Sequence, residues 1–255
     1  MDEDGFDEEI SMDQPDWNDF TAAAAGYFGG IRTPATLITG SSLGFLFAFA
    51  GAMREKNTTT SIAEKSRSYL FLLRLYHSLV VFAFSLALTT VLISTAASVT
   101  ILHARHYPKA QTPHELLRRE FDYEYCVTRW CFIMALQCFV LAVTVKLILE
   151  FELLAQERRF HLVALTSLMM GVLGHALSYV NRTLHSWSNL WELTLHVGFL
   201  VWNEAVGKEG EPRPLLVVSL VSSLVSVLAI IKITLFPTTE KENPSNNDAP
   251  KTKAE

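Results

Sequence analysis

The chain alternates long apolar runs with short polar connectors. The longest run, Ser78–Leu102, contains no charged residue. An α-helix rises about 1.5 Å per residue, so a run of this length crosses a hydrocarbon core of roughly 30 Å. Inside lipid every backbone N–H and C=O needs a partner within the segment, and a helix supplies one for each group. The pattern therefore predicts a membrane-spanning helix.

Four other runs are apolar enough to do the same. The predicted spans are residues 34–53, 76–102, 126–149, 162–180 and 215–236, within a transmembrane helical domain over residues 34–236. Residues 187–203 are apolar and rich in tryptophan but contain Glu192 and His196, which is typical of a helix lying at the membrane interface. The predicted fold class is all-α, a polytopic transmembrane helical bundle. It has four or five spans, depending on whether residues 34–53 cross completely.

Small residues form a stripe on the first predicted span. They recur every four residues and so share one face of the helix: Thr36, Gly40, Gly44, Ala48 and Ala52. In lipid no hydrophobic effect drives helices together, and small residues allow their backbones to approach closely. The stripe is therefore interpreted as a helix-packing face, with the lining of a pore as the alternative.

Polar side chains also occur within the other spans. They are Thr90, Ser94 and Ser98 on one face of the second span, Gln137 and Lys146 in the third, and His175 in the fourth. The three hydroxyls are expected to bond the preceding turn or a neighbouring helix, or to follow an ion path. Lys146 either reaches the interface or lies on a transport path, and His175 is either a buried hydrogen-bonded histidine or a proton or ligand site.

The two ends of the chain are polar and low in apolar residues. Residues 1–20 are rich in Asp and Glu and contain no Lys or Arg, while residues 237–255 are rich in Asn, Pro, Lys and Glu. Both segments are predicted to be disordered tails. Lys and Arg are almost balanced between the two sides of the predicted topology, so the positive-inside rule does not choose an orientation.

Candidate chemistry is sparse in this sequence. His103, His106 and His114 lie in one connector and are the only candidate metal ligands by spacing. The three cysteines form no CxxC pair and are interpreted as buried reduced thiols. No hydrolase, kinase or nucleotide-binding motif occurs, and no basic stripe indicates nucleic acid. We therefore predict no catalytic residue and no cofactor, with the lipid bilayer and other transmembrane helices as partners.

Three short fragments resemble the Orai family of calcium channel subunits. In chain order they are Arg32–Leu37 (RTPATL) followed by Gly40, Thr89–Leu92 (TTVL), and Thr112–Glu115 (TPHE). The resemblance implies a subunit whose first helix surrounds a central pore, with Thr36, Gly40, Gly44 and Ala48 facing that pore. Two features depart from the family. The segment Phe45–Met53 has no carboxylate to replace water around Ca²⁺, and five spans are predicted rather than four.

The expected role is therefore assembly or passive conduction. A scaffold or accessory subunit held by small-residue helix faces is the leading hypothesis, and a channel or carrier subunit is the alternative. A membrane metalloenzyme using His103 and His106 is the third hypothesis.

The predicted spans have a direct biochemical consequence. Because the apolar runs would lie in hydrocarbon, the protein should remain in the pellet when vesicles are washed with alkaline carbonate, and detergent should release it. Recovery of the full-length chain in the carbonate supernatant would contradict this prediction.

Overall fold

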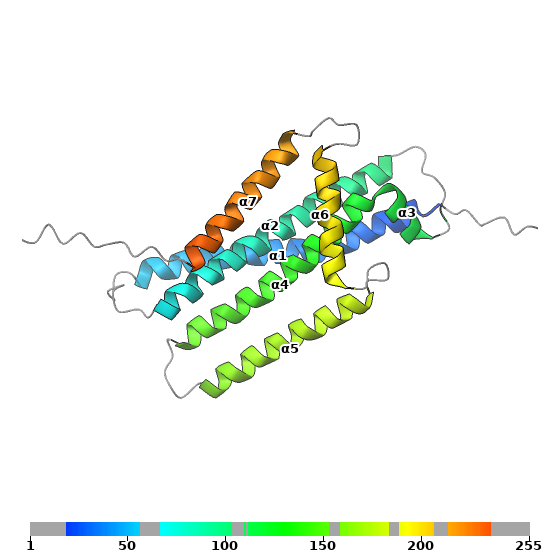
Figure 1. The fold of residues 1–255 in the computed structure, drawn as a ribbon. Helices are drawn as coiled ribbons and strands as arrows, with labels where there is room; N and C mark the ends of the chain where they lie inside the picture. The colour runs from blue at the N-terminus through cyan, green and yellow to red at the C-terminus, as the bar shows by residue number, and fades with distance from the viewer. Residues whose placement is uncertain are drawn as a thin grey trace, which may run out of the picture. The chain divides into compact units, whose positions relative to one another are not determined.

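The computed structural model describes residues 19–56, 67–103, 110, 112–152, 159–183, 189–206 and 214–235. These residues form seven helices and no β-strand (Figure 1). The helices are α1 (Thr21–Lys56), α2 (Arg67–His103), α3 (Pro113–Glu120), α4 (Asp122–Glu152), α5 (Arg159–Thr183), α6 (Leu190–Val206) and α7 (Pro214–Leu235). The predicted all-α class is confirmed for the described part of the chain.

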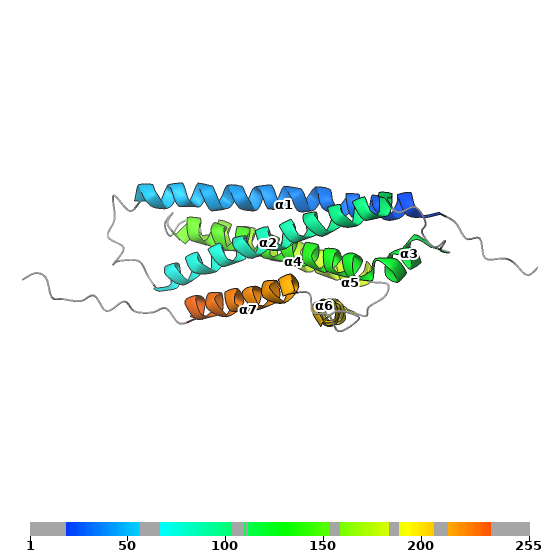
Figure 2. The ribbon, with the colours of Figure 1, turned by 90° about the horizontal axis from the view of Figure 1, so that it is seen from above.

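The long helices α1, α2 and α4 form the centre of the first unit of the chain. Each of the three contacts the other two, and Figure 2 shows α1 running along one side of the group. Helix α5 and helix α6 contact α4, and the short α3 joins α1 to α4. This unit ends at Arg213, and α7 belongs to a second unit that begins at Pro214.

One seam of α2 provides most of its buried side chains. These positions alternate at intervals of four and three residues: Tyr69, Leu73, Tyr76, Val80, Ala83, Ala87, Thr90, Ser94, Ala97 and Ile101. An average interval of 3.5 residues is the seam of a left-handed helix pair with a shallow crossing angle. Large residues occupy the two ends of the seam and small ones its middle. The backbones are therefore able to approach most closely at the centre of the bundle.

Helix α1 begins well before the predicted span. The sequence predicts a break at Gly29–Gly30 and a helix start at Pro34, but α1 begins at Thr21 and contains Pro34 in its interior. The prediction of the start is wrong because tertiary packing outweighs local propensity: Ala24 and Phe28 are fully buried in the core. Immediately before the proline, the Thr33 hydroxyl donates to the Gly29 carbonyl of its own helix at 3.4 Å.

Helix α4 is the most enclosed element of the described fold. None of its residues from 122 to 149 is exposed, because five other helices contact it. Its start is separated from α3 by Phe121, which ends the short helix. The sequence Thr112-Pro113-His114-Glu115 predicts a capped helix start, because Thr is a favoured cap, Pro suits the first helical position and Glu completes a capping box. The structure confirms this start: the Thr112 hydroxyl accepts a hydrogen bond from the Glu115 N–H at 3.2 Å.

Two helices are long and apolar enough to cross a membrane. Their qualifying segments are Tyr69–His103 and Asp122–Leu149. The apolar segments of α5 and α7, Val163–Ser178 and Leu216–Ala229, are shorter. A helix covers every predicted span, but length and composition identify two candidate spans among the described residues, not four or five.

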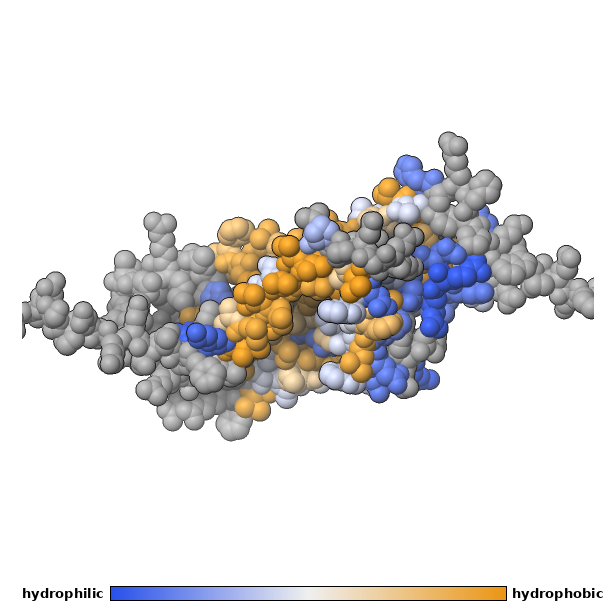
Figure 3. Space-filling model, turned by 45° about the horizontal axis from the view of Figure 1, so that its top comes forward, coloured by the Kyte–Doolittle hydropathy of each residue, from blue (hydrophilic) through white to orange (hydrophobic). Residues whose placement is uncertain are grey.

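Two larger cores lie toward opposite ends of the bundle, and a small one lies between them. One end combines α1, α3, α4 and α6 around residues such as Phe28, Phe121 and Leu193. The other end packs Tyr69 and Tyr76 of α2 against Leu149 of α4. The small cluster between them is Ile38, Ala87 and Ala135, one residue from each central helix. In Figure 3 hydrophilic side chains gather at the end that carries α3.

The central cluster predicts a matched pair of substitutions on α2. Ala87 is fully buried, so Ala87→Leu forces the helices apart and should lower the free energy of unfolding by about 1–3 kcal/mol. Ala96 lies on the exposed side of the same helix, so Ala96→Leu should change it by less than about 0.5 kcal/mol. Denaturant titration in detergent micelles measures both, and equal losses would contradict the proposed seam.

Candidate functional site

The polar end of the bundle joins helices that are distant in sequence. The start of α4 lies beside α6. Asn189 caps the start of α6, and its side-chain oxygen accepts a hydrogen bond from the Glu192 N–H at 3.1 Å. Asparagine favours this position because its side chain satisfies a donor that the first helical turn leaves open. The cap fixes where α6 starts, and so which of its residues face α4.

Three potential metal-binding side chains meet between α4 and α6. Asp122 and Cys126 are one turn apart on α4, and the Cys126 thiol donates to Asp122 Oδ1 at 3.4 Å. From α6, His196 Nε2 lies 3.3 Å from Asp122 Oδ2. The three ligand atoms all lie within 4.8 Å of one another. Cys126 is buried, while Asp122 and His196 are partly open to solvent.

Apolar and polar contacts hold α6 against α4 beside this cluster. Leu193 and Val197 are buried one turn apart in the core, and the Trp130 indole N–H donates to the Thr194 hydroxyl at 2.9 Å. The opposite side of α6 is exposed and mainly apolar, with Glu192 and Asn203 also exposed. Its large apolar residues are Trp191, Leu195, Phe199, Trp202 and Val206. Helix α6 therefore has two apolar faces, of which one is covered by its own chain.

A group of aromatic and polar side chains packs α1 and α3 against the start of α4. Its members are Tyr27, His114, Tyr125 and Arg129. Arg129 Nη1 donates to the Tyr125 hydroxyl at 2.8 Å, and the Tyr27 ring lies 5.1 Å from the Tyr125 ring. Burial is the main cause that raises the pKa of the Tyr27 phenol above its ordinary value. The His114 ring contacts the other side of this group, 5.5 Å from the Tyr125 ring.

The histidines that the sequence predicts as metal ligands are not brought together among the described residues. His114 packs against Tyr125, as above, and His103 ends α2 with Nδ1 at 3.0 Å from the Val99 carbonyl oxygen. His106 lies outside the described residues. Sequence reasoning does not identify the cluster of Asp122, Cys126 and His196 as a potential metal site. Its first two members are visible as a four-residue spacing, but the third comes from a helix about 70 residues away.

The stripe of small residues lies on the outside of α1. Thr36, Gly40, Gly44 and Ala48 are exposed, whereas Ala35, Ile38 and Ser42 on the opposite side are buried. A Cβ atom added at Gly40 or Gly44 would meet no atom within 4 Å. The side chain of Ala52 lies outside the described residues. We call the four exposed positions the small-residue face of α1. Among the described residues, no neighbour covers Gly40 or Gly44 on this face.

The polar residues of α2 lie inside the bundle. Thr90 and Ser94 are fully buried and Ser98 nearly so. Each hydroxyl donates to a carbonyl of the preceding turn: Thr90 to Leu86 at 2.9 Å, Ser94 to Val91 at 3.1 Å and Ser98 to Ser94 at 2.8 Å. Hydroxyls bonded within their own helix can be buried at little cost. In the described fold they allow close helix approach.

The other predicted polar sites are separate from one another. Lys146 Nζ lies 4.8 Å from the centre of the Phe45 ring, so this ammonium contacts α1. Gln137 Nε2 is buried without a hydrogen-bond partner among the described residues. His175 is exposed on α5, so the interpretation as a buried histidine is wrong for the single chain.

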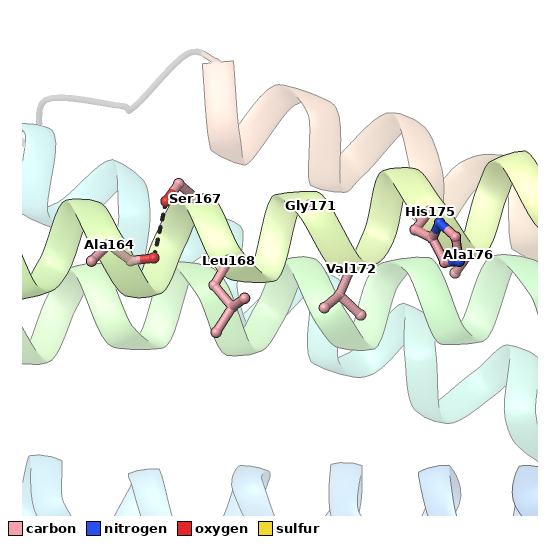
Figure 4. A pocket seen from close by; sticks show the side chains of 7 residues that line it. All are labelled: Ala164, Ser167, Leu168, Gly171, Val172, His175 and Ala176. Atoms are coloured by element: carbon pink, nitrogen blue, oxygen red, sulfur yellow. Dashed lines mark hydrogen bonds between the residues drawn. The ribbon is translucent and has the colours of Figure 1, made fainter.

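His175 borders a shallow hollow of about 660 Å³ on α5. The hollow is lined by Ala164, Ser167, Leu168, Gly171, Val172, His175 and Ala176, and no other described element contributes to the lining. Figure 4 shows that Leu168, Val172 and His175 project from successive turns of this one helix. A single apolar wall with one imidazole does not enclose a ligand.

The chain was compared with protein-family models, curated proteins and solved structures, and none of them matches it.

The attachment of α6 predicts a second matched pair of substitutions. Leu193 is fully buried and Leu195 is exposed on the same helix. Leu193→Ala should leave a cavity that weakens docking by about 2–5 kcal/mol, and amide hydrogen exchange over residues 190–206 should accelerate. Leu195→Ala should leave this exchange unchanged. Equal acceleration in the two variants would contradict the assignment of the buried face.

Proposed function

We propose that the protein is a multi-pass integral membrane subunit that assembles with further copies of itself through the small-residue face of α1. The membrane location is supported by the two long apolar helices. Only 28% of the apolar window of Tyr69–His103 is buried, and α2 exposes Leu92, Val99 and Leu102. A core helix of a water-soluble protein would be mostly buried, whereas lipid accommodates exposed apolar side chains.

The exposed apolar residues of the shorter helices support the same location. On α5 they include Val163, Leu168 and Val172, and α7, described by itself, exposes Val218, Leu224 and Leu228. Exposed apolar patches of this kind are uncommon on soluble monomers. We include α1, α5 and α7 as further spans in this proposal, which gives the five-span arrangement.

The direction and tryptophan residues of α6 support a position of this helix at the membrane surface. It crosses the long helices steeply in Figure 1, so it would run along the membrane surface if α2 and α4 stand across it. Trp191 and Trp202 are both exposed on its outer face. Tryptophan is enriched at the interface between hydrocarbon and water, where its ring is apolar and its N–H is solvated.

The observation that carries the assembly proposal is the bare small-residue face of α1. The other side of the helix is packed against α2 and α4, but Gly40 and Gly44 have nothing near them. A GxxxG face packs well against a second copy of itself, since both helices then present small residues at the contact. A second copy is therefore the occupant that we propose.

A conducting assembly is the second candidate, and one observation favours it. Helix α1 has neighbours on one side, so several copies arranged around an axis would turn the small-residue face inward. This is the arrangement that the Orai-like fragments imply. The absence of a carboxylate from Phe45–Met53 argues against strong selection for Ca²⁺ in such a pore. We propose no catalytic step.

Substitution of Gly40 tests assembly directly. Gly40→Leu places a bulky side chain on the small-residue face, so self-association in liposomes should weaken about tenfold or more, or roughly 1.4 kcal/mol. Energy transfer between two differently labelled copies, measured against the lipid-to-protein ratio, reports the association. Helix content by circular dichroism should not change, because a side chain at Gly40 meets no atom of its own chain.

Gly174→Leu is the matched control for this experiment. Gly174 is also exposed and a Cβ atom added there would meet no atom within 4 Å, but it lies on α5 and not on the small-residue face of α1. Its association should match that of the wild type. Equal energy transfer in Gly40→Leu and wild type would overturn the assembly proposal. Ion flux should also be measured across the membranes of these liposomes. A flux that Gly40→Leu changes would favour the conducting assembly over a scaffold.

A further inference from the structure

The cluster of Asp122, Cys126 and His196 has the geometry of an incomplete metal coordination shell. Two of the three pairs are separated by 3.3 and 3.4 Å, and all three ligand atoms fall within 4.8 Å. Zinc binds nitrogen and oxygen at about 2.0–2.2 Å and sulfur at about 2.3 Å in tetrahedral sites, so two of its ligands lie about 3.3–3.6 Å apart. The separations of 3.3 and 3.4 Å fall in this range, one to each oxygen of the Asp122 carboxylate, and metal binding would draw the remaining atoms of the set closer than the present limit of 4.8 Å.

The three donors also form a chemically coherent set. A thiolate, an imidazole and a carboxylate suit zinc and its neighbours in the transition series, whereas Ca²⁺ and Mg²⁺ prefer oxygen alone. The side chains of Asp122 and His196 are 29% and 31% exposed, so solvent reaches the cluster. A water molecule from that side would complete a tetrahedral shell.

The local structure holds these donors in place. Asp122 and Cys126 lie on successive turns of one rigid helix, so their spacing does not depend on a loop. On α6, Thr194 is bonded to Trp130 and Val197 is buried in the core, and these neighbours fix the position of His196 between them. Donors held on packed helices need little rearrangement to bind a metal.

We propose that Asp122, Cys126 and His196 bind one Zn²⁺ ion, which links α6 to the start of α4. On binding, the Cys126 thiol releases its proton to water and the thiolate coordinates the metal. His196 coordinates through Nε2 as a neutral imidazole, with its ring proton on Nδ1. Asp122 exchanges its contact with the thiol proton for a bond to the ion. No electron transfer is involved. The role is structural, and it is independent of the assembly proposed for α1.

Zinc content of the full chain tests the site. Protein purified in detergent without a histidine tag, loaded with Zn²⁺ and freed of excess metal by dialysis, should retain one equivalent. Cys126→Ser and His196→Gln should each weaken binding by about 100-fold or more in competition with a chromophoric chelator. Cys138→Ser and His175→Gln are matched controls outside the cluster and should bind zinc as the wild type does.

A readout on the wild-type chain removes any dependence on how the variants fold. Co²⁺ in place of zinc should give the charge-transfer absorption of a thiolate-bound metal, and added Zn²⁺ should remove it. Hydrogen exchange over residues 190–206 should slow when zinc is added to wild type but not to His196→Gln. A cobalt complex without the thiolate band, or equal zinc retention by wild type, Cys126→Ser and His196→Gln, would identify an adventitious ion only and overturn the proposal.

Discussion

Close approach of α1, α2 and α4 at the centre of the bundle is the contact on which the rest of the fold depends. Ile38, Ala87 and Ala135 meet there, and the middle of the α2 seam contains only alanine, serine and threonine. In hydrocarbon, dispersion between closely packed backbones must hold helices together, because lipid tails are as apolar as leucine. Small residues make that proximity possible, and the in-helix bonds of Thr90 and Ser94 remove the cost of burying their hydroxyls.

The polar end of the bundle is stabilised by a different balance of forces. Its core contains larger side chains such as Phe28, Phe121 and Leu193, and it includes α3 and α6, which do not contribute to the other two clusters. Charged residues of α3 surround that core, as expected of a layer in contact with water, where burial of apolar area is itself favourable. The same layer positions Asp122 beside His196, so the candidate metal site depends on the α6 packing that it would reinforce.

Periodicity and cap chemistry predicted much of this fold, because both are local. The apolar runs predicted the long helices, and Thr112 with Pro113 predicted the start of α3. The early start of α1 could not be predicted, since Ala24 and Phe28 become helical through contacts with distant elements. For the same reason the spacing of Asp122 and Cys126 was uninformative without His196. The stripe on α1 was visible in the sequence, but only the fold shows that its own chain leaves it uncovered.

In the membrane arrangement proposed above, the crosswise direction of α6 would limit how the bundle responds to bilayers of different thickness. A helix bundle usually adapts to a thin bilayer by tilting, which shortens its projection along the membrane normal. Here a tilt would lift one end of α6 out of the headgroup region and drive the other end into the acyl chains, because Leu193 and Val197 fix α6 to α4. The cost of hydrophobic mismatch would then be borne by deformation of the lipid around the protein.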